Sequence, residues 1–178
     1  MEATMRFMSV DASTTSTGYA IFEGEELIAY GRLQPKQQDW RERIIEQADL
    51  LKNLIVRYSP AKIVVEDVPL MGKGGNKVLV QLGAVQGMLL TLGLPLHFIT
   101  PSQWRSIIGL FDGTVKGTQR NEMKKKSIEK ANKLYGLNLI YKSPTSKYNE
   151  DDISDSILIG YSQICHANKK RDLRKGGV

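Results

Sequence analysis

The chain has 178 residues, of which 41% are hydrophobic, so it can bury one substantial core but is short for two average domains. No apolar run approaches the roughly 18 residues that predict a membrane span, and the first residues lack the order of a signal peptide, so we expect a cytoplasmic protein without membrane contact. The single cysteine, Cys165, excludes an intrachain disulfide and argues against a zinc site built on cysteines.

The formal net charge of +6 is unevenly distributed along the chain. The stretch 168–178 carries five basic residues against one acid, a net +4, which leaves +2 for the rest. We therefore expect a folded domain over 1–167 and a basic, disordered tail over 168–178. The mildly basic body indicates an anionic partner, and nucleic acid fits best. The alternative is a tail that only aids solubility.

Hydrophobic periodicity predicts ten elements. In chain order they are strands over 5–11, 18–23 and 26–33, a helix over 39–58, a strand over 61–66, a helix over 78–92, a strand over 96–99, and helices over about 101–108, 118–135 and 151–166. This order predicts an α/β fold with a five-stranded mixed sheet, in which three antiparallel strands are followed by two parallel ones, flanked by helices.

Acidic residues stand at the ends of these elements. Asp11 closes the apolar run of the first strand, and Glu66 closes that of the fourth. Asp152 and Asp155 open the last helix, three residues apart and so on one helix face. In such sheets the carboxyl ends of the strands near the topological switch face the functional crevice. Converging carboxylates repel one another unless a cation lies between them, so the pattern predicts a divalent metal site.

Simpler explanations exist for these acids. Acids in the first turn of a helix interact favourably with its macrodipole, which explains Asp151 well but Asp155 poorly, because Asp155 lies a turn further in. Glu66 alone is also compatible with an exposed strand end. Strand alternation directs Asp67 to the face opposite Glu66, so Glu66 is the predicted ligand.

The combination of a strand-end Asp, a later strand-end Glu and a helical Asp-x-x-Asp resembles the RuvC family of Holliday-junction resolvases, within the ribonuclease-H-like superfamily. The likeness covers about 5–166 and includes the segments 79–87 and 103–105. A small, basic, tail-bearing chain is similar to the phage-encoded branch, which implies the host-cell cytoplasm. The resemblance implies a homodimer with one site per subunit and four metal-binding carboxylates: Asp11, Glu66, Asp152 and Asp155.

The implied activity is endonucleolytic cleavage of four-way and other branched DNA, such as three-way junctions. Two Mg²⁺ ions per site, for which Mn²⁺ substitutes, would activate a water and stabilise the leaving oxygen. Basic side chains near the scissile phosphate would be Arg105 and one of Lys124, Lys125 and Lys126. We favour Lys125 as the catalytic lysine, although three lysines at a helix start are also typical of a solvated face.

The chain departs from the family in the loop after the glutamate. This loop usually carries an aromatic wedge, but 68–77 contains no Phe, Tyr or Trp. Leu70 and Met71 are the available wedges, with Lys73 and Lys77 for phosphates. Aliphatic side chains stack on bases less well than rings, so the loop predicts relaxed sequence and branch specificity.

Two other functions remain open at this point. A noncatalytic branched-DNA-binding protein would keep the basic surface and use the acids for no reaction. A sugar-kinase or actin-like phosphotransferase is the other, because 11–18 also resembles the first phosphate-binding turn of that superfamily. Those enzymes close two such domains over ATP, and this chain has room for one.

Overall fold

The computed structural model describes residues 5–67, 75–111 and 119–175. Its elements in chain order are β1 (Arg6–Ala12), β2 (Thr17–Glu23), β3 (Glu26–Leu33), α1 (Trp40–Tyr58), β4 (Ile63–Glu66), α2 (Asn76–Leu90), β5 (Leu96–Ile99), α3 (Pro101–Ile107), α4 (Arg120–Tyr135) and α5 (Asp151–Lys175). The strand order across the sheet is β3-β2-β1-β4-β5. β1, β2 and β3 pair antiparallel, whereas β4 and β5 continue parallel to β1. The predicted five-stranded mixed sheet is confirmed.

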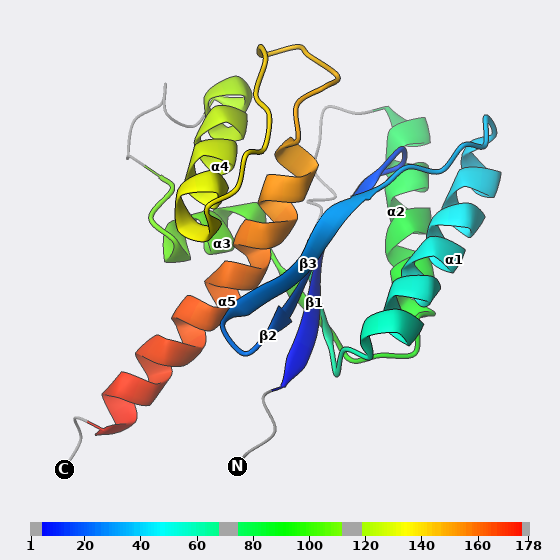
Figure 1. Cartoon of the computed structure of the whole chain (residues 1–178). Coiled ribbons are helices and arrows are strands. Elements are labelled where there is room, and N and C mark those ends of the chain that lie inside the picture. The colour runs from blue at the N-terminus through cyan, green and yellow to red at the C-terminus, as the bar shows by residue number, and fades with distance from the viewer. Residues whose placement is uncertain (1–4, 68–74, 112–118, 176–178) are drawn as a thin grey trace.

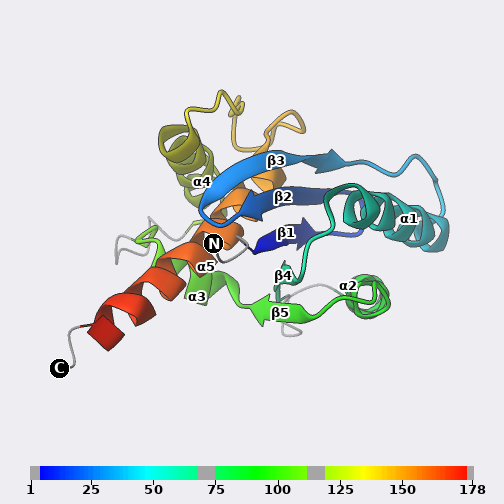
Figure 2. The ribbon, with the colours of Figure 1, turned by 60° about the horizontal axis from the view of Figure 1, so that its bottom comes forward.

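Helices cover both faces of this sheet (Figures 1 and 2). α1 and α2 pack on one face, where Met8, Val10 and Ile21 point. α3, α4 and α5 lie on the other, where Phe7 and Phe22 point. Because side chains alternate along a strand, each central strand supplies both cores. The same alternation sends Asp11 and Glu66 to the α5 face, since each lies an even number of residues from a side chain of that core.

α5 approaches the sheet closely because two glycines remove the side chains that would block it. A Cβ on Gly160 would lie 2.2 Å from Cε2 of Phe22 and 2.7 Å from Oγ of Ser9. A Cβ on Gly18, in β2, would lie 1.9 Å from the backbone oxygen of Asp152. The Ser9 hydroxyl donates to the backbone oxygen of Ser156 at 2.7 Å and fixes the helix at this depth. The first turn of α5 is therefore held directly over β1 and β2.

The C-terminal prediction is wrong for 168–175, because α5 continues through these residues as one helix of 25 residues. The basic stretch contains no glycine or proline before Gly176, and its lysines and arginines are good helix formers. Asn168 donates to Glu25 at 3.1 Å, and Arg171 forms an ion pair with the same carboxylate at 3.6 Å. Residues 168–175 of α5 thus contact the turn between β2 and β3. In the part of the chain that the structure describes, no helix is both long and apolar enough to cross a membrane.

We predict that Gly160→Ala destabilises the fold by about 1–3 kcal/mol, because the added methyl must displace Phe22 and Ser9 in a packed interface. Gly87→Ala is the matched control, since Gly87 is also helical but its Cβ would meet nothing within 4 Å. Alanine should be neutral or stabilising there by about 0.5–1 kcal/mol. Urea unfolding of both variants measures the difference, and equal stabilities would contradict the close-approach argument.

Candidate active site

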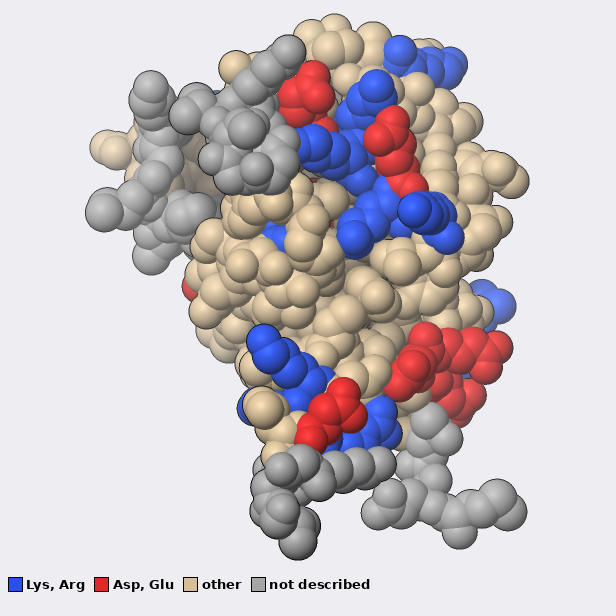
Figure 3. Space-filling model, turned by 90° about the vertical axis from the view of Figure 1, so that its left-hand side faces the viewer, with Lys and Arg blue, Asp and Glu red and all other residues tan. Residues whose placement is uncertain are grey.

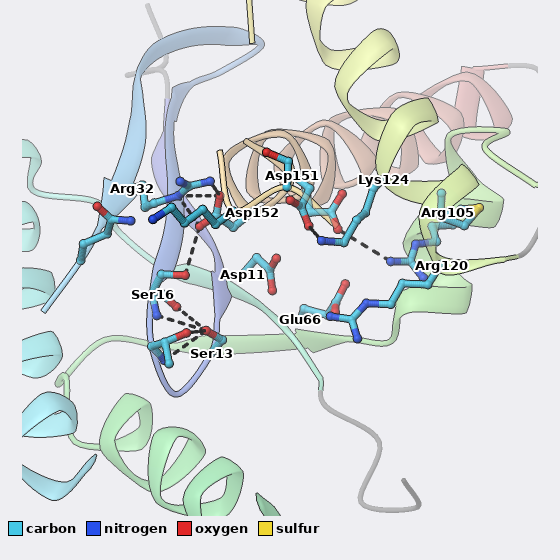
Figure 4. Close-up of a pocket in the computed structure, with 16 residues that line it drawn as sticks. Asp11, Ser13, Ser16, Arg32, Glu66, Arg105, Arg120, Lys124, Asp151 and Asp152 are labelled. Atoms are coloured by element: carbon cyan, nitrogen blue, oxygen red, sulfur yellow. Dashed lines mark hydrogen bonds and ion pairs between the residues drawn. The ribbon is translucent and has the colours of Figure 1, made fainter. Parts of the chain in front are cut away.

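A cavity of about 620 Å³ lies between the first turn of α5, the carboxyl ends of β1 and β4, and the start of α4 (Figure 4). Its lining is mostly charged and polar. Acidic and basic side chains also lie side by side on the face shown in Figure 3, so this surface is not uniformly basic. The lining residues are Asp11, Ser13, Thr15, Ser16, Arg32, Gln34, Glu66, Arg105, Arg120, Met123, Lys124, Ser146, Lys147, Asp151, Asp152 and Asp155.

The four carboxylates singled out from the sequence converge in this cavity. Burial raises the pKa of Asp11 well above its usual range, and repulsion from the surrounding acids raises it further, in the order Glu66, Asp155, Asp152 and Asp151. Burial and then the charge of Glu66 raise the pKa of Asp155 to about 7. Such shifts arise when like charges are brought together away from water, and they are typical of functional sites.

Each acid has a different local environment. The Trp104 indole donates to Oε2 of Glu66 at 2.6 Å, which opposes the burial that raises the pKa of this carboxyl. Arg105 lies 3.7 Å from Oδ2 of Asp155, too far for a hydrogen bond. Oδ1 of Asp155 is buried and finds no hydrogen-bond partner among the described residues. Asp67 lies on the other side of β4 and accepts from Gln86 at 3.2 Å, as strand alternation predicted.

The carboxylates of this cavity suit a divalent cation, because carboxylate oxygens are the ligands that Mg²⁺ and Mn²⁺ prefer. A bound cation would also give the buried Oδ1 of Asp155 the partner that it lacks. In their present arrangement, no three or more His, Cys, Asp or Glu side chains within the described segments form a metal-holding group. Figure 4 also shows that Asp152 is turned toward Arg32. Metal binding would therefore require side-chain movement.

Arg32, on β3, is one residue of this site that sequence reasoning missed. Its Nε donates to both oxygens of Asp152, at 2.8 Å and 2.6 Å, and its Nη2 donates to Oδ1 as well. Nη2 also donates to the backbone oxygen of Asn149 at 2.6 Å. The signal lies in the strand register, because Arg32 pairs with Gly18, the residue on which the start of α5 rests.

The basic residues are placed differently from the sequence expectation. Lys124 lines the cavity and forms an ion pair with Asp151 at 2.7 Å. Lys125, the lysine we favoured, does not line this cavity and pairs with Glu129 on the exposed helix face at 3.8 Å. Lys124 therefore lies nearer the acids than Lys125, because a rotation of about 100° per helical residue turns its neighbour away from α5.

Other predicted DNA contacts are scattered or cannot be placed. Arg105 lines the cavity, whereas Lys126 lines a separate depression beside Phe111 and Lys77 is exposed in the first turn of α2. Leu70, Met71 and Lys73 lie outside the described residues. Arg120 and Lys147 line the cavity and were not predicted.

No protein-family model matches the chain, and no curated protein matches it. Solved structures do. Thermus thermophilus RuvC in complex with a Holliday junction substrate matches with a TM-score of 0.68 at 15% identity, over 93% of this chain and 96% of that one. A second Thermus thermophilus RuvC structure matches with a TM-score of 0.63 at 17% identity, over 93% and 97%. The chain thus has the ribonuclease-H-like fold of RuvC over nearly its whole length.

The raised pKa of Asp155 predicts how stability depends on pH without metal. In the unfolded chain this carboxyl ionises near its ordinary value of 3.8, whereas in the folded chain it stays protonated up to about 7. Between these values only the folded state holds the proton. The free energy of unfolding should therefore fall as pH rises through this window, by at most about 1.4 kcal/mol per pH unit from this group.

Urea unfolding in EDTA from pH 4 to pH 8 measures this dependence. Asp155→Asn should reduce the decline and be more stable than wild type at pH 8. Asp67→Asn is the matched control, because its carboxyl lies on the opposite side of β4. An Asp155→Asn profile parallel to wild type would refute the assignment.

Proposed function

We propose that the protein is a metal-dependent endonuclease that cleaves Holliday junctions and other branched DNA, with relaxed sequence specificity. The observation that carries the proposal is the convergence of Asp11, Glu66, Asp152 and Asp155 in one cavity, on the fold of a protein solved with a Holliday junction. The unit that would carry this activity is 1–167, and the proposed location is the cytoplasm of a host cell, if the chain is phage-encoded.

The four carboxylates are the proposed ligands of two Mg²⁺ ions, with Mn²⁺ able to replace them. Bound ions would supply an acidified water and neutralise charge on the phosphate. The chain's own groups have positioning roles. Trp104 fixes Oε2 of Glu66 and leaves Oε1 free for a cation, and Ser9 fixes the depth of α5 and hence of Asp155.

Basic residues at the cavity are the proposed contacts for the DNA backbone. Arg105 and Lys124 each lie beside an acid of the site, so they are close to where a scissile phosphate would lie. Arg120 and Lys147 extend this basic lining. Outside it, Lys77 and the undescribed Leu70, Met71 and Lys73 remain candidates for strand separation and phosphate contact, and Lys125 and Lys126 for more distant contacts.

The proposed assembly is a homodimer through α2. Val80, Gly83, Gly87 and Leu90 follow one another at spacings of three, four and three, so they form one stripe along the helix. Val80 and Leu90 are 60% and 66% exposed, and the glycines leave open space. Val85, Met88 and Leu89 on the other side already cover the sheet. An exposed apolar stripe with small residues is suited to a second copy of the same helix.

A noncatalytic branched-DNA-binding protein is the second candidate, favoured by the diversion of Asp152 to Arg32 and by the absence of a ready metal-holding group among the described residues. Cleavage of labelled four-way, three-way and linear DNA with and without Mg²⁺ or Mn²⁺ separates the two. Metal-dependent cutting of branched DNA supports the endonuclease, and tight binding without cutting supports the second candidate.

Asp11→Asn, Glu66→Gln and Asp155→Asn should each reduce cleavage at saturating Mg²⁺ by at least about a thousandfold, because each removes a proposed ligand. Branched-DNA affinity should be retained, since basic residues supply most of it. Asp67→Asn is the matched control and should cleave normally, because Asp67 faces Gln86. A variant with normal cleavage would remove that residue from the proposed ligands.

Val80→Glu should dissociate the proposed dimer by placing two charges in an apolar contact. Leu134→Glu on α4 is the matched control, because Leu134 is also exposed but lies across the sheet from α2. Light scattering at micromolar concentration gives the masses. A wild-type protein that remains at 20 kDa with and without junction DNA would rule out the dimer.

A further inference from the structure

The Asp152 carboxylate is fully occupied by hydrogen bonds within the chain. Its Oδ1 accepts from Nε and Nη2 of Arg32 and from the backbone nitrogen of Ile153 at 2.9 Å. Its Oδ2 accepts from Nε of Arg32 and from the Ser16 hydroxyl at 3.2 Å. Two carboxylate oxygens offer about four lone-pair positions, so little capacity is left for a cation.

The other three acids of the site contrast with Asp152. Within the described segments, no hydrogen bond reaches the Asp11 carboxyl, Glu66 uses only Oε2, and Oδ1 of Asp155 is an orphan. These three can take up a cation without losing a partner in the chain. Asp152 can do so only if the Arg32 guanidinium leaves it.

The pair between Arg32 and Asp152 is costly to break without a replacement. The two side chains are only 19% and 15% exposed, so a separated guanidinium would remain partly buried without a counter-charge. Arg32 also lines the cavity that contains Arg105 and Lys124, and its contact with the Asn149 backbone keeps it near that position. A phosphate in the cavity could therefore accept from the guanidinium in place of Asp152, because both anions suit its fork of donors.

From this geometry we propose that Arg32 is a positioning residue that withholds Asp152 from the metal site until a DNA phosphate takes over its guanidinium. The inference rests on the proposed function and deepens it, because it couples substrate binding to completion of the metal site. Without DNA, Asp11, Glu66 and Asp155 can take up a metal ion once their side chains adjust, whereas any ion that needs Asp152 must first displace Arg32. With DNA, the Arg32 guanidinium moves to a phosphate of the DNA backbone, and Asp152 is released as the fourth carboxylate.

Calorimetric titration with Mn²⁺ alone, without DNA, tests the first half of this proposal. Arg32→Gln should tighten Mn²⁺ binding about tenfold or add a second bound ion, since coupling between contacting residues is commonly of this size. Lys124→Gln is the matched control: it also removes one positive charge from the cavity, but from Asp151 rather than Asp152. It should have a clearly smaller effect.

A double-mutant cycle shows whether Arg32 acts through Asp152. In an Asp152→Asn background, Arg32→Gln should lose its effect on Mn²⁺ binding, because no carboxylate remains to be released. An undiminished effect there, or equal effects of Arg32→Gln and Lys124→Gln, would mean general electrostatics and would overturn the proposal. Mn²⁺ binding and cleavage by wild type, with no change in Arg32→Gln, would overturn this inference alone. Absence of Mn²⁺ binding by every protein would overturn the proposed function with it.

Binding of a synthetic four-way junction to the metal-free protein tests the second half. Arg32→Gln should weaken this binding several-fold, whereas Arg6→Gln should not, because Arg6 pairs with Glu23 away from the cavity. Arg32→Lys keeps the charge but cannot form the bidentate contact, so it should tighten Mn²⁺ binding and retain junction binding. Arg32→Lys also replaces Arg32→Gln in the Mn²⁺ titration if Arg32→Gln fails to fold. Unchanged junction affinity in Arg32→Gln would overturn the phosphate hand-over.

Discussion

The contact between α5 and the sheet is the constraint on which the rest of the site depends. Strand alternation can direct Asp11 and Glu66 to one face, but it cannot bring a helix close enough to add carboxylates to them. Gly18 and Gly160 permit that approach, and Ser9 holds the helix there through the backbone oxygen of Ser156. A bulkier residue at position 18 would push the backbone of Asp152 itself away. The absence of a Cβ at Gly18 and Gly160 therefore determines how closely the acids of α5 approach those of the sheet.

Acids crowded by this contact are tolerated because most of them have a partner in the chain. Arg32 pairs with Asp152 and Lys124 with Asp151, while Arg105 lies near Asp155. The balance is uneven, since Asp152 and Asp151 form the close ion pairs, whereas the raised pKa values belong to Asp11, Glu66 and Asp155. The unbalanced charge at the centre is what a divalent cation would neutralise.

The sequence predicted the sheet and its acids well because both depend on local periodicity. The ends of the apolar runs marked Asp11 and Glu66, and alternation along β4 separated Glu66 from Asp67, all without tertiary information. Arg32 was missed because its role depends on the register between β2 and β3 and on the contact between the start of α5 and Gly18. Lys125 was chosen over Lys124 because helix rotation cannot be fixed to within one residue from a run of three lysines. The helical course of 168–175 was missed because charge alone was taken to favour disorder.

The contacts that Trp104 and Arg32 make with acids of the site differ in a way that bears on function. Trp104 is a fully buried neutral donor, so its bond to Glu66 fixes one oxygen without supplying a positive charge. Arg32 both fixes and neutralises Asp152. A protein that only bound DNA would gain nothing from crowding Glu66 with Asp11 and Asp155 in a buried site, because buried like charges cost stability. The arrangement around Glu66 therefore supports the proposed endonuclease over the proposed binding protein, and the pair between Arg32 and Asp152 bears on when the proposed metal site is complete.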